Sequence, residues 1–512
     1  MADPRPQLLR RLQEQEVWDL LVIGGGATGL GTAFDAACRG LRVLLLEGKD
    51  FAKGTSSRAT KLVHGGVRYL AQGNVHLVRE ALRERGRLEH NAPHLVNRLG
   101  FLLPLYQIWS GPFYGSGLRL YDLLAGSLSL GRTERIGPGR ALELAPTLRR
   151  QGLRGAVRYF DGRFDDARLA VTLLRSLFDE GGLALNYFPV RELVKLGGRV
   201  SGVVAQDSET GQRHEIRARV VVNATGVFAD AVRQLDRPDV SPLLSPSQGI
   251  HLVVDKEFWP SEDALMIPRT DDGRVMFAVP WHGRVLLGTT DTPVQQLSEE
   301  PAALPEEVEL ILKTASGYLE AAPQRRDVRS VFAGLRPLVK RGGEQSSGRI
   351  SRDHLLFSSE SGLITITGGK WTTYRHMAEQ TVDLALKVGG LRYRTSPTAD
   401  LRLHGAESSP GASVYGSDQA EVDQLGESPL LPGQPLREGQ VRYAARQELA
   451  RTVEDVLARR SRLLLLDAQA SVAAAPQVAR LLAEELGRDA LWEEEQVSSF
   501  TALAQNYLID PS

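Results

Sequence analysis

Residues 19–47, DLLVIGGGATGLGTAFDAACRGLRVLLLE, decide the fold of this 512-residue chain. The apolar run at 19–23 is typical of a parallel strand that is buried on both faces. Residues 27–39 follow as a predicted helix, which Gly40 can cap, and 42–47 as a second apolar strand. A strand, a glycine turn, a helix and a strand in this order predict a Rossmann-like α/β unit.

The turn after the first strand, Gly24-Gly25-Gly26-Ala27-Thr28-Gly29, satisfies the GxGxxG pattern. Its glycines allow the backbone to approach a pyrophosphate, and the helix N-terminus offers N–H groups to the anion. Glu47 lies 18 residues after Gly29, where its carboxylate can accept hydrogen bonds from a ribose diol. A glycine-rich turn with an incidental acid is the alternative. The preceding strand, the following helix and Glu47 together favour a dinucleotide site, and since the sequence has one such fingerprint, one dinucleotide is expected. Because the acid would repel a 2′-phosphate, FAD and NAD are favoured over NADP.

Composition excludes several other classes of protein. Lys plus Arg and Asp plus Glu both number 62, so the chain lacks the basic excess of a dedicated nucleic-acid binder. Cys38 is the only cysteine in the sequence, which predicts a reducing, cytoplasmic compartment. The first 16 residues show no apolar core of a signal peptide, and no apolar run is long enough to predict a spanning helix. No metal-ligand spacing and no GxSxG elbow are present, so neither a metal site nor acyl transfer is predicted.

The remaining sequence divides into a longer α/β part and a helical C-terminal part. A charged helix is predicted over 74–92, and strands over 183–222, over a hairpin at 274–290 and over 363–367. Residues 404–440 are rich in Gly, Ser, Pro and acids and predict a linker or docking segment. A C-terminal helical domain is predicted over 441–512, with helices at 441–465, 475–487 and 491–508.

Seven blocks, in order along the chain, resemble the FAD-dependent, respiratory glycerol-3-phosphate dehydrogenases, within the glycine and D-amino-acid oxidase-like flavoproteins. They are DFAKGTSSRATKLVHGGVRYL (50–70), NATGVFAD (223–230), SPSQGIHLVV (245–254), GTTDTP (288–293), AGLRPL (333–338), SRDH (351–354) and ITGGKWTTYRHMAE (366–379). The resemblance implies FAD rather than NAD. It also implies a discontinuous Rossmann-like FAD-binding domain, an interleaved α+β substrate or cap domain, and the helical domain. The implied segments are 17–85, 155–225 and 345–400 for FAD, and 86–154 and 226–344 for the cap.

The cofactor residues come from several of these blocks. Thr55, Ser56 and Ser57 resemble the family's contacts to the FAD pyrophosphate and flavin, although hydroxyls after a glycine can equally cap a helix. NATG ends a buried strand, where a cofactor crevice is expected. Gly368 and Gly369 would let backbone N–H groups approach the flavin. The expected cofactor-binding residues are Gly24, Gly26, Thr28, Gly29, Glu47, Thr55, Ser56, Ser57, Ala224, Gly226, Gly368, Gly369 and Lys370.

Oxidation of a secondary alcohol needs a base for the hydroxyl proton and an acceptor for the hydride, and a phosphate needs cations. The resemblance implies that Arg68, Tyr69 and Arg352 lie near the substrate phosphate. It places Arg336 and Lys370 near the reacting oxygen, where a cation stabilises a developing alkoxide.

Two histidines are candidate bases. His251 is the first, because the ordinary pKa of a histidine, ~6.5, suits proton abstraction near neutrality. His64, in a turn expected beside the flavin, is the second, and it could instead orient the isoalloxazine. For His251 the alternative is a strand histidine that only packs. His354 is expected to play a supporting part.

A reduced flavin must also pass its electrons on. Residues 99–130 are apolar and aromatic, and they predict either a buried part of the cap domain or a segment lying on a membrane surface. The resemblance favours a peripheral enzyme at the cytoplasmic membrane that reduces a membrane quinone, and it leaves a homodimer open. Net charge is unevenly spread: +9 over 51–150 and −7 over 401–512. The basic region suits an anionic substrate, cofactor or lipid surface.

Two other functions stay open from the sequence. A glycerol-3-phosphate oxidase would resemble the dehydrogenases but would reduce O2 to H2O2. A non-catalytic FAD-binding protein would keep the cofactor site without turnover. The reaction that the resemblance implies is the oxidation of sn-glycerol 3-phosphate to dihydroxyacetone phosphate.

Overall fold

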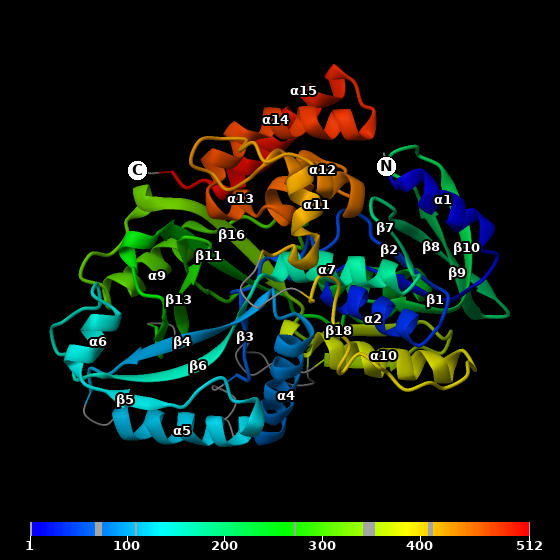
Figure 1. Cartoon of the computed structure of the whole chain (residues 1–512). Helices are drawn as coiled ribbons and strands as arrows, with labels where there is room; N and C mark the ends of the chain where they lie inside the picture. The colour runs from blue at the N-terminus through cyan, green and yellow to red at the C-terminus, as the bar shows by residue number, and fades with distance from the viewer. Residues whose placement is uncertain are drawn as a thin grey trace.

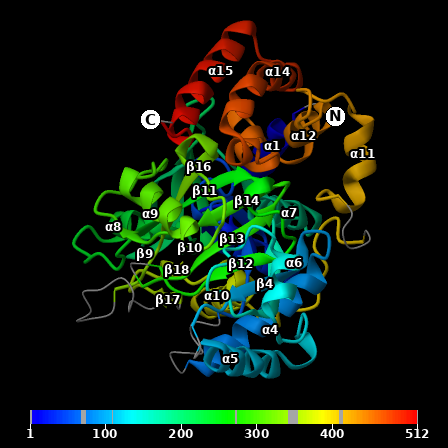
Figure 2. The same cartoon turned by 90° about the vertical axis from the view of Figure 1, so that its left-hand side faces the viewer.

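The structure, a computed structural model, describes residues 3–66, 74–107, 110–270, 273–340, 354–407 and 413–510. Two β-sheets lie side by side, and helices from the end of the chain lie above both of them (Figure 1). In the view turned by 90°, α14 and α15 again lie at the top of the molecule, as they do in Figure 1 (Figure 2). The mixed α/β architecture with a helical C-terminal part agrees with the fold predicted from the sequence.

The first sheet has the strand order β17-β18-β10-β1-β2-β7, and β8 and β9 extend from β10. The pairs β1–β10, β1–β2, β2–β7 and β10–β18 are parallel, as the buried apolar strands predict. The turn at Gly197-Gly198 is also as predicted, between β8 and β9. The strands are β1 (Trp18–Ile23), β2 (Val43–Leu46), β7 (Leu183–Leu185), β8 (Val190–Leu196), β9 (Arg199–Gln206), β10 (Arg213–Asn223), β17 (His354–Ser358) and β18 (Ile364–Gly368).

The glycine turn lets a helix pack directly against the end of β1. Helix α2 (Ala27–Cys38) begins as the turn ends. A Cβ on Gly29 would lie 1.8 Å from the Gly24 carbonyl oxygen, so only glycine fits there. Gly24 has φ +108°, in the region that favours glycine. Helices α7 (Asp166–Asp179) and α10 (Tyr374–Val388) pack against α2.

The second sheet has the order β15-β11-β14-β13-β12-β4-β6-β3, with β16 paired to β11 and β5 to β6. The predicted hairpin turns at His282-Gly283, between β13 and β14. The predicted charged helix is α4 (Val75–Asn91), which Asn74 caps by accepting from the Leu77 N–H. The strands are β3 (Leu62–Val63), β4 (Val96–Pro104), β5 (Glu134–Ile136), β6 (Ala156–Phe164), β11 (Ser247–Asp255), β12 (Ala264–Ile267), β13 (Met276–Trp281), β14 (Arg284–Gly288), β15 (Thr292–Pro293) and β16 (Val328–Arg336).

Two strands cross the predicted boundary between the first two domains. The predicted FAD-binding domain includes residues 17–85 and 155–225. Strand β3 lies in the first of these ranges and β6 in the second, yet both strands belong to the second sheet. β6 pairs antiparallel with β4 over nine residues, and that hydrogen-bonded ladder decides where it lies. The other helices beside the second sheet are α5 (Ser110–Ala125), α6 (Pro138–Leu144) and α9 (Pro305–Ser316). Helices α1 (Arg5–Glu14) and α8 (Ala229–Asp236) pack on the first sheet, α1 beside β7 and α8 against β8, β10 and β18.

The C-terminal part is helical, but the helix predicted over 441–465 is interrupted. Helix α12 ends at Gln447, and Asp455–Arg460 forms a π-helical turn. Leu449 and Arg462 both have φ near +60°, a left-handed conformation that ends a regular helix. Predicted linker residues form α11 and pack through Val422 and Tyr415 against Tyr443. The helices are α11 (Gln419–Gln424), α12 (Glu438–Gln447), α13 (Leu463–Leu466), α14 (Ala468–Leu486) and α15 (Ala490–Ala504).

Candidate functional site

Four parallel strands end at one edge of the first sheet, and the predicted cofactor residues follow their ends. Ile23 pairs with Leu46 and with Asn223, and Asn223 pairs with Thr365. The glycine turn, Glu47, the NATG turn and Gly368-Gly369 therefore come together from four separate parts of the sequence. Their backbones are close: a Cβ on Gly24 would lie 2.7 Å from the Ala224 carbonyl oxygen.

Glu47 braces the glycine turn from the end of β2. Its Oε2 accepts from the Gly25 N–H at 2.6 Å, and its Oε1 accepts from the Lys49 N–H at 2.9 Å. Burial raises the pKa of Glu47 above its usual value, and these two backbone donors oppose the rise. A carboxylate at this place is also the acceptor that a ribose diol requires.

Thr55, Ser56 and Ser57 form a short 3₁₀ turn that joins the two sheets. Ser56 Oγ accepts from the Ala27 N–H at 2.9 Å, so this hydroxyl satisfies a backbone donor at the start of α2, whose N-cap residue is Gly26. The Ser56 carbonyl accepts from Trp371 Nε1 at 2.9 Å. Thr55 Oγ1 donates to the Leu335 carbonyl at 2.5 Å, which ties the turn to β16.

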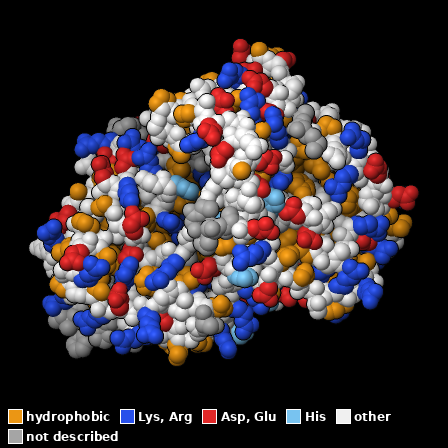
Figure 3. Space-filling view, viewed as in Figure 1, with side chains coloured by type: hydrophobic (Ala, Val, Ile, Leu, Met, Phe, Trp, Pro, Cys, Tyr) orange, Lys and Arg blue, Asp and Glu red, His pale blue; other side chains and the backbone are white. Residues whose placement is uncertain are grey.

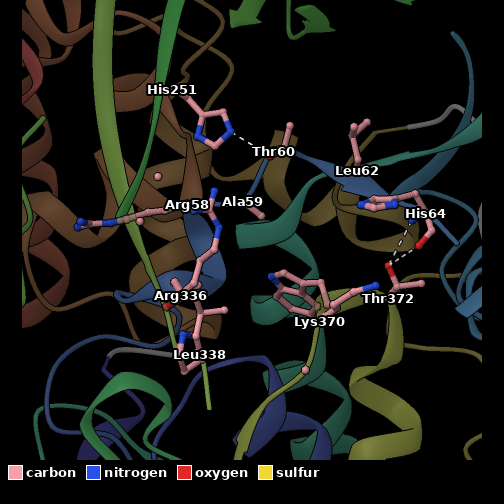
Figure 4. Close-up of a pocket in the computed structure, with 16 residues that line it drawn as sticks. Arg58, Ala59, Thr60, Leu62, His64, His251, Arg336, Leu338, Lys370 and Thr372 are labelled. Atoms are coloured by element: carbon pink, nitrogen blue, oxygen red, sulfur yellow. Dashed lines mark hydrogen bonds between the residues drawn. The ribbon is translucent and has the colours of Figure 1, made fainter. Parts of the chain in front are cut away.

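A cavity of about 220 Å³ lies where this turn meets the second sheet (Figure 4). Four of the predicted site residues line it: His64, His251, Arg336 and Lys370. Gly369 and Thr55, which are predicted cofactor residues, line it as well. Four further lining residues were not predicted from the sequence, although all lie inside the blocks at 50–70 and 366–379: Arg58, Thr60, Trp371 and Thr372. Arg68, Tyr69 and Arg352 lie outside the described residues.

Arg336 ends β16, and acceptors from β11 and from the turn that follows β14 hold its guanidinium in place. Nη1 pairs with Asp291 Oδ1 at 3.1 Å, and Nη2 donates to the Thr290 carbonyl at 3.0 Å and to Thr289 Oγ1 at 3.1 Å. Only 22% of the Arg336 side chain is exposed. Asp291 stands in the GTTDTP block, whose role the sequence alone did not indicate. A guanidinium held in this way is a fixed cation at the cavity wall.

His251 enters the cavity from β11. Its Nε2 lies 2.9 Å from Thr60 Oγ1, and its ring stacks on Phe332 with centroids 5.0 Å apart. Its Nδ1 is buried without a hydrogen-bond partner among the described residues. Burial, and then the charges of Lys61 and Arg336, hold the pKa of His251 well below 6.5. The imidazole is therefore neutral near pH 7 but a weaker base than an ordinary histidine, so the pKa of ~6.5 expected from the sequence does not hold at this site.

His64 and Lys370 line the side of the cavity opposite His251 (Figure 4). The His64 N–H donates to Thr372 Oγ1 at 3.2 Å, which links β3 to the segment after β18. His354 Nε2 lies 2.6 Å from Gln380 Oε1, and His354 is absent from the cavity lining. Among the described residues, the cavity lining thus contains the imidazoles of His64 and His251 and the cations Arg58, Arg336 and Lys370.

The edge of the sheet and the cavity fit a dinucleotide with a redox ring. Three glycines, at 24–26, leave the turn before α2 free of Cβ atoms, which suits a pyrophosphate at the helix N-terminus. Glu47 suits a ribose diol, and the cavity continues from the end of β18. Fold and site together are those of a dinucleotide-dependent oxidoreductase, with cations beside the place of the redox ring.

Comparison with known proteins names the class and then the family. Residues 19–375 match the family "FAD dependent oxidoreductase", and residues 363–496 match the family "C-terminal domain of alpha-glycerophosphate oxidase". The chain therefore belongs to the FAD-dependent oxidoreductases, and it is an FAD-dependent enzyme.

Within this class the chain belongs to the glycerol-3-phosphate dehydrogenases. It is 39% identical to the mitochondrial glycerol-3-phosphate dehydrogenase of Homo sapiens, over 97% of this chain and 74% of that protein. It is 36% identical to the mitochondrial enzyme of Saccharomyces cerevisiae, over 97% of this chain and 91% of that protein. The solved structure of the glycerol-3-phosphate dehydrogenase from Bacillus halodurans, complexed with FAD, is 32% identical with a TM-score of 0.81, and covers 100% of this chain and 98% of that chain.

Replacing Glu47 by glutamine separates its two roles. Burial raises the pKa of Glu47 in the folded state above its value in the unfolded state. The stabilisation that comes from the protonated carboxyl group is therefore complete below the unfolded-state pKa and is lost as the pH rises through the folded-state pKa. At pH 7 the amide removes a buried charge, but it offers one acceptor oxygen to two backbone N–H donors, so the melting temperature should fall. Loss of a charged acceptor for the ribose should weaken FAD binding about tenfold. Glu14→Gln, on the exposed end of α1, is the control, and equal FAD affinity in both variants would contradict the ribose role.

Proposed function

We propose that this chain oxidises sn-glycerol 3-phosphate to dihydroxyacetone phosphate with FAD, and that a membrane quinone takes the electrons. The observation that carries the proposal is the cavity, where held cations and a neutral imidazole meet at the end of the dinucleotide edge. Membership of the glycerol-3-phosphate dehydrogenases supports the choice of substrate. When bound, FAD supplies the acceptor for the hydride from the alcohol carbon.

The residues of the cavity would bind the substrate and move its hydroxyl proton. Arg336 and Lys370 attract the phosphate-bearing substrate and stabilise negative charge that develops on the reacting oxygen. A proton from the hydroxyl can reach His251 Nε2 through the Thr60 hydroxyl, 2.9 Å away. An anionic substrate offsets the charges of Lys61 and Arg336, which depress the pKa of His251, so binding favours proton uptake. Arg68, Tyr69 and Arg352 remain proposed phosphate ligands, as the resemblance implies.

Helix α5 supports the proposed contact with a membrane surface. Leu123 is 77% exposed and Leu120 is 44% exposed on this helix, while Tyr121 and Leu118 are buried. Basic side chains are frequent along the lower edge of the face that holds α4 and α5 (Figure 3), and residues 51–150 carry a net charge of +9. Among the described residues no helix is long and apolar enough to cross a bilayer. We infer a peripheral enzyme that docks on anionic lipid at the cytoplasmic membrane.

An oxidase is the second candidate function. The match of residues 363–496 to a domain described for alpha-glycerophosphate oxidase favours keeping it. The fold is also similar to the L-alpha-glycerophosphate oxidase of Mycoplasma pneumoniae, at 16% identity with a TM-score of 0.59. The two functions share the oxidation of the alcohol and differ only in what reoxidises the flavin.

Anaerobic addition of sn-glycerol 3-phosphate to the purified holoenzyme should bleach the flavin absorbance near ~450 nm, a property of the cofactor. Reoxidation should then be fast with a soluble quinone and slow with air. Absence of bleaching would reject the enzyme proposal and favour a non-catalytic FAD-binding protein. Peroxide formation in air at the turnover rate would replace the dehydrogenase by the oxidase.

Arg336→Ala should retain FAD but lose most of this bleaching, because the cation at the cavity wall is removed. A loss of about 10²-fold or more in the rate of flavin reduction is expected for removal of a charge-stabilising donor. Arg329→Ala is the matched control, since Arg329 lies on the same strand but pairs with Asp255 far from the cavity lining. Loss of FAD from the Arg336 variant alone would make this residue structural.

Leu123→Glu should weaken binding to vesicles that contain anionic lipid, measured by sedimentation. Withdrawing one leucine from the lipid interface should cost about tenfold or more in affinity, because a buried leucine contributes ~1.5–3 kcal/mol. The matched control is Leu196→Glu, which alters a leucine that is 78% exposed on β8. Equal loss of binding in both variants would remove α5 from the proposed membrane face.

A further inference from the structure

Arg58 is a buried cation that lines the cavity and joins its two halves. The residue is 5% exposed and follows the turn that caps α2. Its Nη1 donates to the Ala333 carbonyl at 3.1 Å, on the strand that ends at Arg336. The same strand passes so closely that a Cβ on Gly334 would lie 3.0 Å from the Arg58 carbonyl oxygen. Arg58 therefore sets the spacing between the dinucleotide edge and β16.

Two residues that are distant in the sequence hold the other arm of this guanidinium. Nη2 of Arg58 pairs with Glu300 Oε1 at 2.7 Å. The same Glu300 oxygen accepts from the Tyr507 hydroxyl at 2.5 Å. Tyr507 is 4% exposed and ends the 3₁₀ turn that follows α15, so the C-terminal helical domain reaches the residue that fixes Arg58.

Further charges tie the same region to the C-terminal domain. Lys53 Nζ lies 3.3 Å from Glu300 Oε2 and 2.6 Å from Glu454 Oε1. Glu454 Oε1 also pairs with Arg459 at 2.7 Å. Burial alone would raise the pKa of Glu454, but the charges and hydrogen bonds of Arg459 and Lys53 outweigh it and lower the pKa to about 2. Glu454 is thus ionised at neutral pH and holds Lys53 beside Glu300, which pairs with both Lys53 and Arg58.

We propose that Arg58 is a positioning residue of the cavity, and that the C-terminal helical domain holds it in position through Tyr507 and Glu300. The proposal gives a role to a domain whose sequence carries no chemical motif, and it rests on the proposed function only for its kinetic test. Without the Tyr507 hydroxyl, the side chains of Glu300 and Arg58 are less restrained. Arg58 then holds β16 less firmly, so the position of Arg336 relative to the dinucleotide edge varies more. A small misplacement of this kind slows a reaction more than it weakens binding.

Tyr507→Phe removes one hydroxyl from the holoenzyme and tests the proposal directly. The limiting rate of flavin reduction by sn-glycerol 3-phosphate should fall about tenfold, while the substrate concentration for half-maximal rate changes by less than about twofold. Tyr443→Phe is the matched control, because Tyr443 is also buried in the C-terminal part and donates to a carboxylate, Asp418, that lies off the cavity lining. Equal rates in the two variants would overturn the proposal.

Arg58→Lys shows whether Tyr507 acts through Arg58. Lysine keeps the charge for Glu300 but cannot also donate to the Ala333 carbonyl in the geometry of a guanidinium. If the proposal is correct, adding Tyr507→Phe to Arg58→Lys produces no further fall in rate. If the rate of the double variant instead falls by the product of the two single-variant factors, Tyr507 and Arg58 act independently and the proposal is overturned.

Hydrogen–deuterium exchange gives a readout that needs no turnover. Peptides that cover 50–66 and 328–338 should exchange faster in Tyr507→Phe and at the wild-type rate in Tyr443→Phe. Wild-type exchange of both peptides in Tyr507→Phe would overturn the positioning role. If the wild-type flavin is not bleached by sn-glycerol 3-phosphate, the proposed function fails and the exchange data alone decide this inference.

Discussion

The structure depends on one close approach between backbones, at the turn between β1 and α2. Gly29 packs so tightly on Gly24 that a single Cβ would come within 1.8 Å of a carbonyl oxygen, and Gly24 itself packs on the backbone of Ala224. These contacts bring the start of α2 and the ends of β1 and β10 together. The predicted cofactor residues Gly24, Gly26, Gly29 and Ala224 lie at or beside that approach, and the cavity lies beyond it.

Buried charges then hold the second half of the molecule to this edge. Lys61 and Asp166 are fully buried and pair at 2.7 Å, one on the segment before β3 and the other at the start of α7. Asp50, three residues beyond Glu47, pairs with Arg459 and Arg460 of the C-terminal part, and these arginines keep the pKa of Asp50 low. Loss of one partner from such a pair leaves a buried charge uncompensated, at a cost of ~3–5 kcal/mol. The charged clusters therefore specify one arrangement of the domains.

The dinucleotide edge could be predicted from the sequence because its signals are local. Gly24, Gly29 and Glu47 lie within 24 residues, and each follows a strand whose apolar pattern is unambiguous. His251, Arg336 and Lys370 came from the resemblance, and they do meet in one cavity. The sequence did not single out Arg58, Asp291 or Tyr507. Arg58 and Asp291 lie inside the resembling blocks but are ordinary polar residues in a sequence rich in arginine and acids, and Tyr507 lies outside the blocks. Their partners are set by contacts between distant segments.

The sequence by itself determined the Rossmann-like unit, the dinucleotide site and the helical character of the C-terminal part. Periodicity, glycine spacing and a short range of residues carry that information. Tertiary structure alone decided that β3 and β6 join the second sheet and that Leu449 and Arg462 interrupt the predicted helix. It also decided that Tyr507 donates to Glu300, the partner of Arg58 in the cavity lining. The physical reason is that strand pairing, backbone conformation at a helix end and buried ion pairs depend on groups far apart in the chain, which no local pattern encodes.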